Sequence, residues 1–489
     1  MLTSLLTSGY GAVHQLPAMV APPHYLALLS TLTVHPTLTT RAKTAERMRA
    51  GSSALRYLRL VLDNVGPMRG KLAEAFSFVT PETKSRRGGR RRNQDQADSP
   101  EKGDENVIDN DLANSGALWA HAEDFWHVVG WAFNCSVLHQ RRWEAWETWL
   151  MYMIEVLEAD WGLRLLEDTG SLEDSLIIRY ITAEGATRLN ERRVLRAVFA
   201  NGSKKSENEF GEVWRNETKE LKKDGGIQRP EKRVDIDANN YGDYLDGEQD
   251  DELESSSQDS SHEEEKSPSK IDQQSLSNDS PIPNGADLLG GMESIALRVR
   301  LLSLLSKVSA VIPESFIHTK GLYDLYLDHI RPLPLPTFFI MMSPLGLRHF
   351  TLEARSALTQ YILRTMIAST APEPPSDYLD QDVLGHCYLP FPANSTSTID
   401  NTKVSLCVET LLRLLDKHAG LEWTPELHAA AEKGIHARKT KAKTVQYKRG
   451  TDGDASADGM WLRGSAERIR MVLKMARPEL EEMEDLSQS

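Results

Sequence analysis

Apolar residues recur at every third or fourth position through almost every hydrophobic stretch of this chain. That spacing places them on one face of an α-helix. Strand signals are scarce, because no Asn-Gly or Asp-Gly pair is flanked by alternating β-branched residues. The sequence therefore predicts an all-α fold of roughly a dozen helices. The main periodic runs are Leu55 to Val65, Trp146 to Trp161, Leu297 to Ile312, Leu352 to Met366 and Val404 to Leu415.

Prolines mark two further helix starts. A first helix is predicted over 24–34, entered through Pro22 and Pro23, because proline pre-sets the backbone of a first helical turn. Residues 337–342 (TFFIMM) follow three prolines and fit a short buried strand or a buried helix start equally well. No repeat of roughly 33–47 residues is visible. The helices therefore form either an irregular bundle or a degenerate helical-hairpin array.

Polar and charged segments divide the helical sequence into two blocks. The first block, 1–221, is interrupted by a basic and polar loop at 80–114. A linker at 222–285 follows, with thirteen acidic and no basic residues between Asp235 and Glu265. The second block, 286–480, contains a Pro/Ser loop at 371–401 and a basic segment at 433–449. The loops and linker are predicted to be disordered, since they cannot bury enough apolar surface to offset the entropy of ordering.

Tryptophan is concentrated in one part of the first block. Seven of the ten tryptophans lie within 116–161, where the pattern predicts two helices, 116–138 and 141–160, packed as a hairpin. One interpretation is a core built from large aromatic side chains. The alternative is an aromatic groove for a partner protein, because residues three apart drift around a helix and would need a wide buried face. The predicted partner-binding residues are Trp143, Trp146 and Trp149.

Motifs of the common enzyme and metal sites are absent from the sequence. It has no phosphate-binding glycine loop of the Walker or dinucleotide type, no H-E-x-x-H and no G-x-S-x-G. The nearest metal pattern is His121, Glu123, Asp124 and His127, but His121 falls on a different part of the predicted helix. We therefore predict no catalytic, cofactor-binding or metal-binding residue.

Composition limits the compartment and the class of protein. The net charge of −14 argues against a polycation that coats nucleic acid. Three scattered cysteines fit neither a disulfide framework nor a zinc site. No stretch approaches the roughly 18 apolar residues of a membrane span. The N-terminus has no Lys or Arg before Arg41, which argues against a mitochondrial presequence.

Two basic segments predict nuclear location or contact with an acidic partner. The first segment, 84–92, is compatible with a nuclear import signal, with contact to nucleic-acid phosphates or with docking onto an acidic protein. It is also compatible with a run of charges that is only solvated. The second segment, 433–449, lies in a predicted helix whose first turn is capped by Thr424. Its positive charges either complement the dipole at the C-terminus of that helix or contact nucleic acid. The acidic run 235–265 could screen the second segment. The basic residues are Lys84, Arg86, Arg87, Arg90, Arg91 and Arg92, then Lys433, Arg438, Lys439, Lys441, Lys443, Lys448 and Arg449.

Four serines in the linker segments are predicted phosphorylation sites. Ser99 and Ser267 each begin an S-P-x-K pattern that resembles the substrates of cyclin-dependent kinases. Ser260 and Ser261 each have Glu three residues on, which resembles acidophilic casein-kinase sites. Phosphate there would add negative charge to segments that could tune binding.

These features together predict a non-enzymatic helical scaffold or adaptor that acts through protein–protein contacts in a nuclear assembly. The alternative is a nucleic-acid- or chromatin-associated subunit that uses the basic segments 84–92 and 433–449. The third reading is an enzyme whose site is assembled from distant residues. A cytoplasmic location is the alternative to the nucleus. Partners are predicted to be other proteins, with no cofactor and no membrane.

Overall fold

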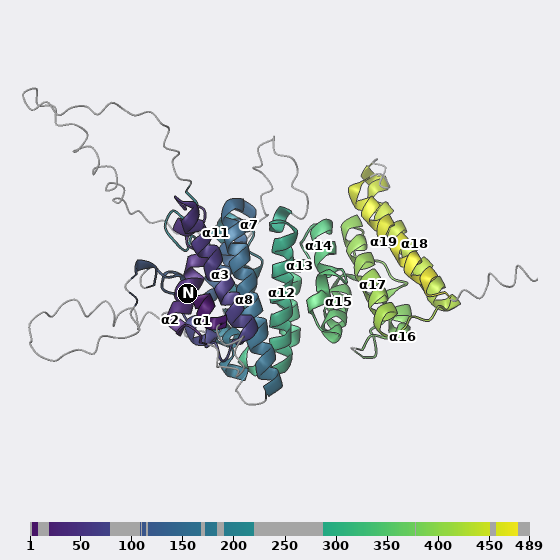
Figure 1. Ribbon diagram of the computed structural model, residues 1–489. Coiled ribbons are helices and arrows are strands. Elements are labelled where there is room, and N and C mark those ends of the chain that lie inside the picture. Colours follow the sequence, from purple (N-terminus) through teal and green to yellow (C-terminus); the bar gives the residue numbers. More distant parts are fainter. Residues whose placement is uncertain are drawn as a thin grey trace, which may run out of the picture. The chain divides into compact units, whose positions relative to one another are not determined.

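Helices make up all the named secondary structure in the part of the chain that the structure describes. The computed structural model describes residues 2–7, 19–78, 108, 110–113, 116–167, 172–182, 190–219, 287–376, 378–449 and 456–477. Outside the helices, these residues contain one isolated antiparallel bridge, between Ile367 and Ala393. The all-α prediction is therefore confirmed (Figure 1).

The helix bounds follow the periodic runs of the sequence. Before the acidic linker the α-helices are α1 (Leu2–Thr7), α2 (Pro23–Val34), α3 (Ala45–Asn64), α4 (Leu72–Ala75), α6 (Leu118–His121), α7 (Phe125–Leu138), α8 (Gln140–Glu167), α9 (Leu176–Ile181), α10 (Asn190–Val198) and α11 (Lys204–Glu209). After it they are α12 (Gly291–Val311), α13 (Thr319–Ile330), α14 (Leu335–Met342), α15 (Leu352–Met366), α16 (Gln381–Val383), α17 (Thr398–His418), α18 (Pro425–Arg449) and α19 (Ala457–Met475). Short 3-10 turns are η1 (Pro36–Leu38), η3 (Asp111–Ala113), η4 (Leu172–Asp174), η6 (Asp287–Leu289), η7 (Pro313–Ser315) and η8 (Gly346–His349), and η9 (Leu384–Tyr388) is a π-helix.

Side-chain caps explain where several of these helices begin. The first backbone N–H groups of a helix lack an intrahelical partner, and a preceding hydroxyl or carboxylate can accept from them. Asp124 accepts from the backbone N–H of His127 at 2.7 Å, which starts α7. Thr424 accepts from that of Leu427 at 3.1 Å, so the predicted cap of α18 is confirmed.

The predicted tryptophan hairpin is present, with its first helix divided. Residues 116–138 form α6 and α7, separated by the cap at Asp124, and α8 packs against α7 after a turn at His139. Residues 337–342 lie in α14, which settles the choice between strand and helix. Pro336 sits in the first turn of that helix, where its missing N–H costs nothing.

The predicted Pro/Ser loop over 371–401 is a loop only in part. Residues 381–388 form α16 and η9, which pack against α17 and α18. Val383, Leu384 and Tyr388 are buried there. The polar composition of the surrounding residues concealed this short apolar run.

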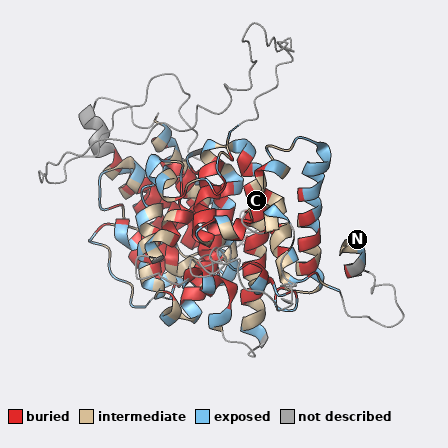
Figure 2. Ribbon diagram, turned by 90° about the vertical axis from the view of Figure 1, so that its left-hand side faces the viewer, coloured by how far each residue is buried: buried red, intermediate tan, exposed pale blue. Residues whose placement is uncertain are grey.

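The chain on both sides of the acidic linker belongs to one compact unit. This unit comprises Met1–Lys219 and Pro283–Ser489, and nearly all of its described buried apolar side chains form one cluster. The other unit, Glu220–Ile282, lies outside the described residues. Helix α12 packs against α7 and α8 (Figure 1) and also against α10, so it joins the two sequence blocks. Figure 2 shows the buried residues on the helix faces that meet one another.

Arg298 of α12 contacts residues of both sequence blocks. Its guanidinium is fully buried and donates to the backbone oxygens of Val198 at 2.6 Å and Leu289 at 3.3 Å. It also lies 4.0 Å from the ring centre of Phe133. Burial lowers the pKa of Arg298 to about 9. Gly290, with φ of +79°, turns the chain into α12 where a Cβ atom would overlap the α7 side chain beneath it.

No helix among the described residues is long and apolar enough to cross a bilayer.

Candidate functional site

The three predicted partner-binding tryptophans lie in the core. Trp143 is 2% exposed, and Trp146 and Trp149 are fully buried. Helix α8 packs against α2, α3, α7, α9 and α12, so nearly every face of it is covered. Residues that drift around such a helix remain inside. This corrects the partner-binding hypothesis, since in this structure none of the three can reach a partner.

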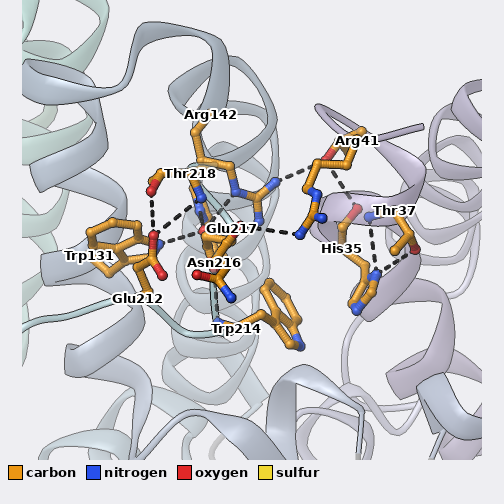
Figure 3. Close-up of polar contacts among 12 residues, drawn as sticks. His35, Thr37, Arg41, Trp131, Arg142, Glu212, Trp214, Asn216, Glu217 and Thr218 are labelled. Atoms are coloured by element: carbon orange, nitrogen blue, oxygen red, sulfur yellow. Dashed lines mark hydrogen bonds and ion pairs between the residues drawn. The ribbon is translucent and has the colours of Figure 1, made fainter. Parts of the chain in front are cut away.

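The carboxylate of Glu217 is the polar partner of two indoles in this core. Its Oε1 accepts from Trp131 Nε1 at 2.6 Å and from Arg142 Nε at 2.7 Å (Figure 3). The same oxygen accepts from Trp146 Nε1 at 3.0 Å. Its Oε2 accepts from the backbone N–H of Trp214 at 3.0 Å. A buried indole N–H needs an acceptor, and one ionised carboxylate provides it for both rings.

Arg142 and Glu217 form an ion pair with almost no access to water. Their side chains are 2% and 0% exposed. The Arg142 guanidinium also lies 4.9 Å from the ring centre of Trp146, and its Nη1 donates to Thr39 at 2.9 Å. The residues just before the acidic linker are thereby tied to α7 and α8. We interpret this cluster as structural, because its groups are enclosed by the core.

His35 borders the same cluster. Its Nδ1 lies 2.8 Å from the hydroxyl of Thr37, and its ring meets the edge of Trp214 at 5.0 Å (Figure 3). Burial first, and the Arg142 charge second, lower the pKa of His35 to about 4. The ring is therefore neutral at pH 7.

The weak metal pattern around α6 and α7 is taken up by other contacts. Asp124 caps α7 and pairs with Arg193, which also pairs with Glu123 at 3.1 Å. His127 Nε2 lies 3.1 Å from the backbone oxygen of Gly211, and burial lowers the pKa of His127. Among the residues that the structure describes, no group of three or more His, Cys, Asp or Glu side chains could hold a metal ion.

Part of the predicted basic segment 433–449 faces inward. Arg438 is fully buried, and its Nη1 donates to the backbone oxygens of Leu389 at 3.1 Å and Phe391 at 3.2 Å. Lys441 donates to that of Ala393 at 2.6 Å. These two cations hold the chain after η9 against α18. Including Arg438 in a surface patch is therefore wrong.

The other residues of the predicted basic segments and phosphorylation sites are either exposed or have no described side chain. Lys433 and Lys439 are exposed on α18. The side chains of Lys443, Lys448 and Arg449 are not described. The remaining predicted residues, Lys84, Arg86, Arg87, Arg90, Arg91, Arg92, Ser99, Ser260, Ser261 and Ser267, lie outside the described residues.

An apolar groove that the sequence analysis did not predict opens between α12, α14 and η8. We call it the α12–α14 groove, and its volume is about 410 Å³. One wall is the α12 stripe Met292, Ile295, Ala296 and Val299, which are spaced as one helix face. The other wall consists mainly of Phe339, Ile340, Ser343 and Leu345.

The rim of the α12–α14 groove exposes large apolar side chains. Met292 is 54% exposed and Leu345 is 71% exposed, while Ile295 and Val299 of the α12 wall are buried. Among the charged and titratable lining residues, Glu293 lies beside Met292 in the first turn of α12, and Arg348 and His349 lie on η8. The backbone oxygen of His349 accepts from Ser303, one turn beyond Val299. The groove therefore has an acidic end and a basic end.

The sequence carried a signal for this groove. Helix α12 has two apolar stripes: the periodic run that begins at Leu297 is mostly core, and the stripe from Met292 to Val299 borders the groove. A second stripe on one helix indicates a second covered or bindable face.

Comparison with known proteins adds no family. No protein-family model and no curated protein matches this chain.

Proposed function

We propose that this chain is a non-catalytic helical scaffold or adaptor that binds other proteins in a nuclear assembly. The observation that carries the proposal is the α12–α14 groove. Single exposed apolar residues are normal on a protein surface, but Met292 and Leu345 adjoin an apolar groove. Contiguous exposed apolar surface of this kind is typical of a contact site.

The walls of the α12–α14 groove are formed by packed helices. These helices belong to the single apolar cluster, so the walls keep their geometry without a partner. A preformed surface loses less conformational entropy on binding than one that must first fold. This supports a scaffold that presents a docking face.

The test is affinity purification of the tagged full chain with quantitative mass spectrometry. Wild type is compared with Leu345→Asp, at the groove rim, and with Met471→Asp, an exposed apolar residue of α19. A defined set of proteins that Leu345→Asp loses and Met471→Asp keeps would support the proposal. Wild type that enriches no stable partner would refute it.

The alternative, nucleic-acid binding, is favoured by the exposed Lys433 and Lys439 on α18. Binding through phosphate contacts weakens steeply with salt, and Lys433→Glu with Lys439→Glu would reduce it. Retention on DNA or RNA that shows both properties would replace the scaffold proposal. Nuclear location is tested separately by imaging a fluorescent fusion with and without residues 84–92.

A further inference from the structure

We infer that the α12–α14 groove binds an amphipathic α-helix of a partner protein, with basic residues at the helix end that lies beside Glu293 and an acidic residue at the other. This inference rests on the proposed function and names the chemistry of the partner. The occupant is a helix with apolar anchors on one face, and the charges at the two ends of the groove set its orientation.

The size of the groove fits side chains from one face of a helix. A cavity of roughly 150 Å³ can hold a benzene-sized group, so about 410 Å³ accommodates two or three large apolar side chains. Anchors at helix positions i, i+3 or i+4, and i+7 line up along one face and enter such a groove together. Ala296, in the α12 wall, is small and exposed, which leaves room for a helix to approach α12.

The surroundings favour a helix over an extended peptide. The groove is walled by helices, whose backbone groups are paired within each helix. An extended segment in an apolar groove would leave its own N–H and C=O groups without partners, which is costly. A helix satisfies those groups internally and presents only side chains.

Glu293 lines the groove next to Met292, and two carboxylates of α8, Glu144 and Glu147, are close enough to interact with it or with each other. Glu293 and Glu144 are exposed, and Glu147 of α8 is half-buried. Burial first, then repulsion from Glu293 and Glu144, raises the pKa of Glu147, as expected when the three lie close together. No ion pair between described residues neutralises any of them. Lys or Arg on a bound helix would relieve this repulsion.

The opposite end carries a cation. Arg348 is exposed, and its Nε lies 3.1 Å from Nε2 of His349. Burial, then the charges of Arg300 and Arg348, lower the pKa of His349, so that ring is neutral at pH 7. Arg300 is paired with Glu158 at 2.5 Å. Arg348 therefore supplies the charge at the rim, which an Asp or Glu on the bound helix would complement.

The probes are three fluorescein-labelled peptides of about sixteen residues, long enough to form a helix. The first has leucines spaced on one face, lysines at one end and a glutamate at the other. The second has the same leucines with glutamates at both ends. The third is a shuffled form of the first that has no apolar face. Fluorescence anisotropy measures binding of each to the full chain, and we expect the first to bind at least about tenfold more tightly than the others.

Variants of exposed residues in the groove and beside it test the contacts. Leu345→Asp is expected to lower the affinity for the first peptide by at least about tenfold, because it places a charge against the leucines. Glu293→Lys with Glu144→Lys is expected to remove the preference for the first peptide over the second. Met471→Asp, an exposed position that is not among the groove-lining residues, is expected to leave all affinities unchanged. Circular dichroism of each variant is the check that a loss of binding does not come from unfolding.

Two results would overturn the inference. One is equal binding of the shuffled peptide, which would show that no helical face is recognised. The other is an unchanged charge preference in Glu293→Lys with Glu144→Lys. If the peptides fail to bind but cellular partners still co-purify, this inference falls and the scaffold proposal stands. If the peptides bind as expected but no partner co-purifies, the scaffold proposal is the one refuted.

Discussion

Replacing Glu217 by glutamine tests whether one buried carboxylate holds the tryptophan core together. The glutamine has nearly the same size, and its carbonyl oxygen can still accept from an indole N–H. The change removes the negative charge that faces Arg142, whose side chain is 2% exposed. It also introduces an NH2 group where Trp131, Trp146 and Trp214 already direct donors at both carboxylate oxygens.

The expected cost follows from this geometry. Removing one partner of a buried ion pair leaves an uncompensated charge, and such changes cost about 3–5 kcal/mol. Whole domains are stable by about 5–15 kcal/mol. We therefore expect Glu217→Gln to lower the free energy of unfolding by about 3–5 kcal/mol while the chain still folds.

The assay is urea unfolding of the full chain, followed by tryptophan fluorescence. The matched control is Glu212→Gln, the same chemical change at an exposed carboxylate that accepts from the backbone N–H of Thr218 at 3.2 Å. The control is expected to change stability by no more than about 0.5 kcal/mol. A second arm adds Arg142→Met to Glu217→Gln, and removing the stranded cation should recover part of the lost stability.

The reasoning would be refuted if Glu217→Gln lost no more stability than Glu212→Gln. It would also fail if adding Arg142→Met to Glu217→Gln lowered the free energy of unfolding further, by as much as Arg142→Met does alone. That result would mean the two charges do not depend on each other.

Three further predictions rest on single buried contacts, all read by urea unfolding. Gly434→Ala would bring a Cβ atom 1.7 Å from the backbone oxygen of Leu389, so it should lower the free energy of unfolding by about 1–3 kcal/mol. The Cβ atom of Gly162→Ala in α8 meets nothing within 4 Å, so this control should raise stability by about 1 kcal/mol. Equal effects of the two substitutions would contradict this reasoning. The pKa of His35 is lowered to about 4, so its contribution to stability is present above pH 6.5 and lost as the pH falls toward 4, and His35→Gln should flatten that part of the pH profile; an unchanged slope would count against it. Arg298→Met leaves two buried backbone oxygens without donors and should cost about 3 kcal/mol, whereas a neutral result would show that water replaces the guanidinium.

Local physics explains which parts of this fold were predictable. Helix spacing and helix starts depend on residues within a few positions of each other, so the hairpin of α7 and α8 and the Thr424 cap could be read directly. The outcome at 337–342 could not, because strand and helix are both compatible with a short apolar run after prolines.

Residues far apart in the chain decided the rest. Glu217 is the partner of Arg142 and of two indoles from α7 and α8 across about 71–86 positions, and nothing in its own neighbourhood identifies it. Arg438 looked like one more basic residue of a solvated helix end, yet the backbone after η9 covers it.

The helical class, most helix positions and the positions of the charged segments could be predicted from the sequence, because they depend on local spacing and composition. Which helix faces are covered depends on packing between distant segments, which encloses Trp143, Trp146 and Trp149 and leaves Met292 and Leu345 at the rim of an open groove. An apolar residue on a helix is driven equally toward a core or a partner. Which of the two it meets depends on the helices that pack around it.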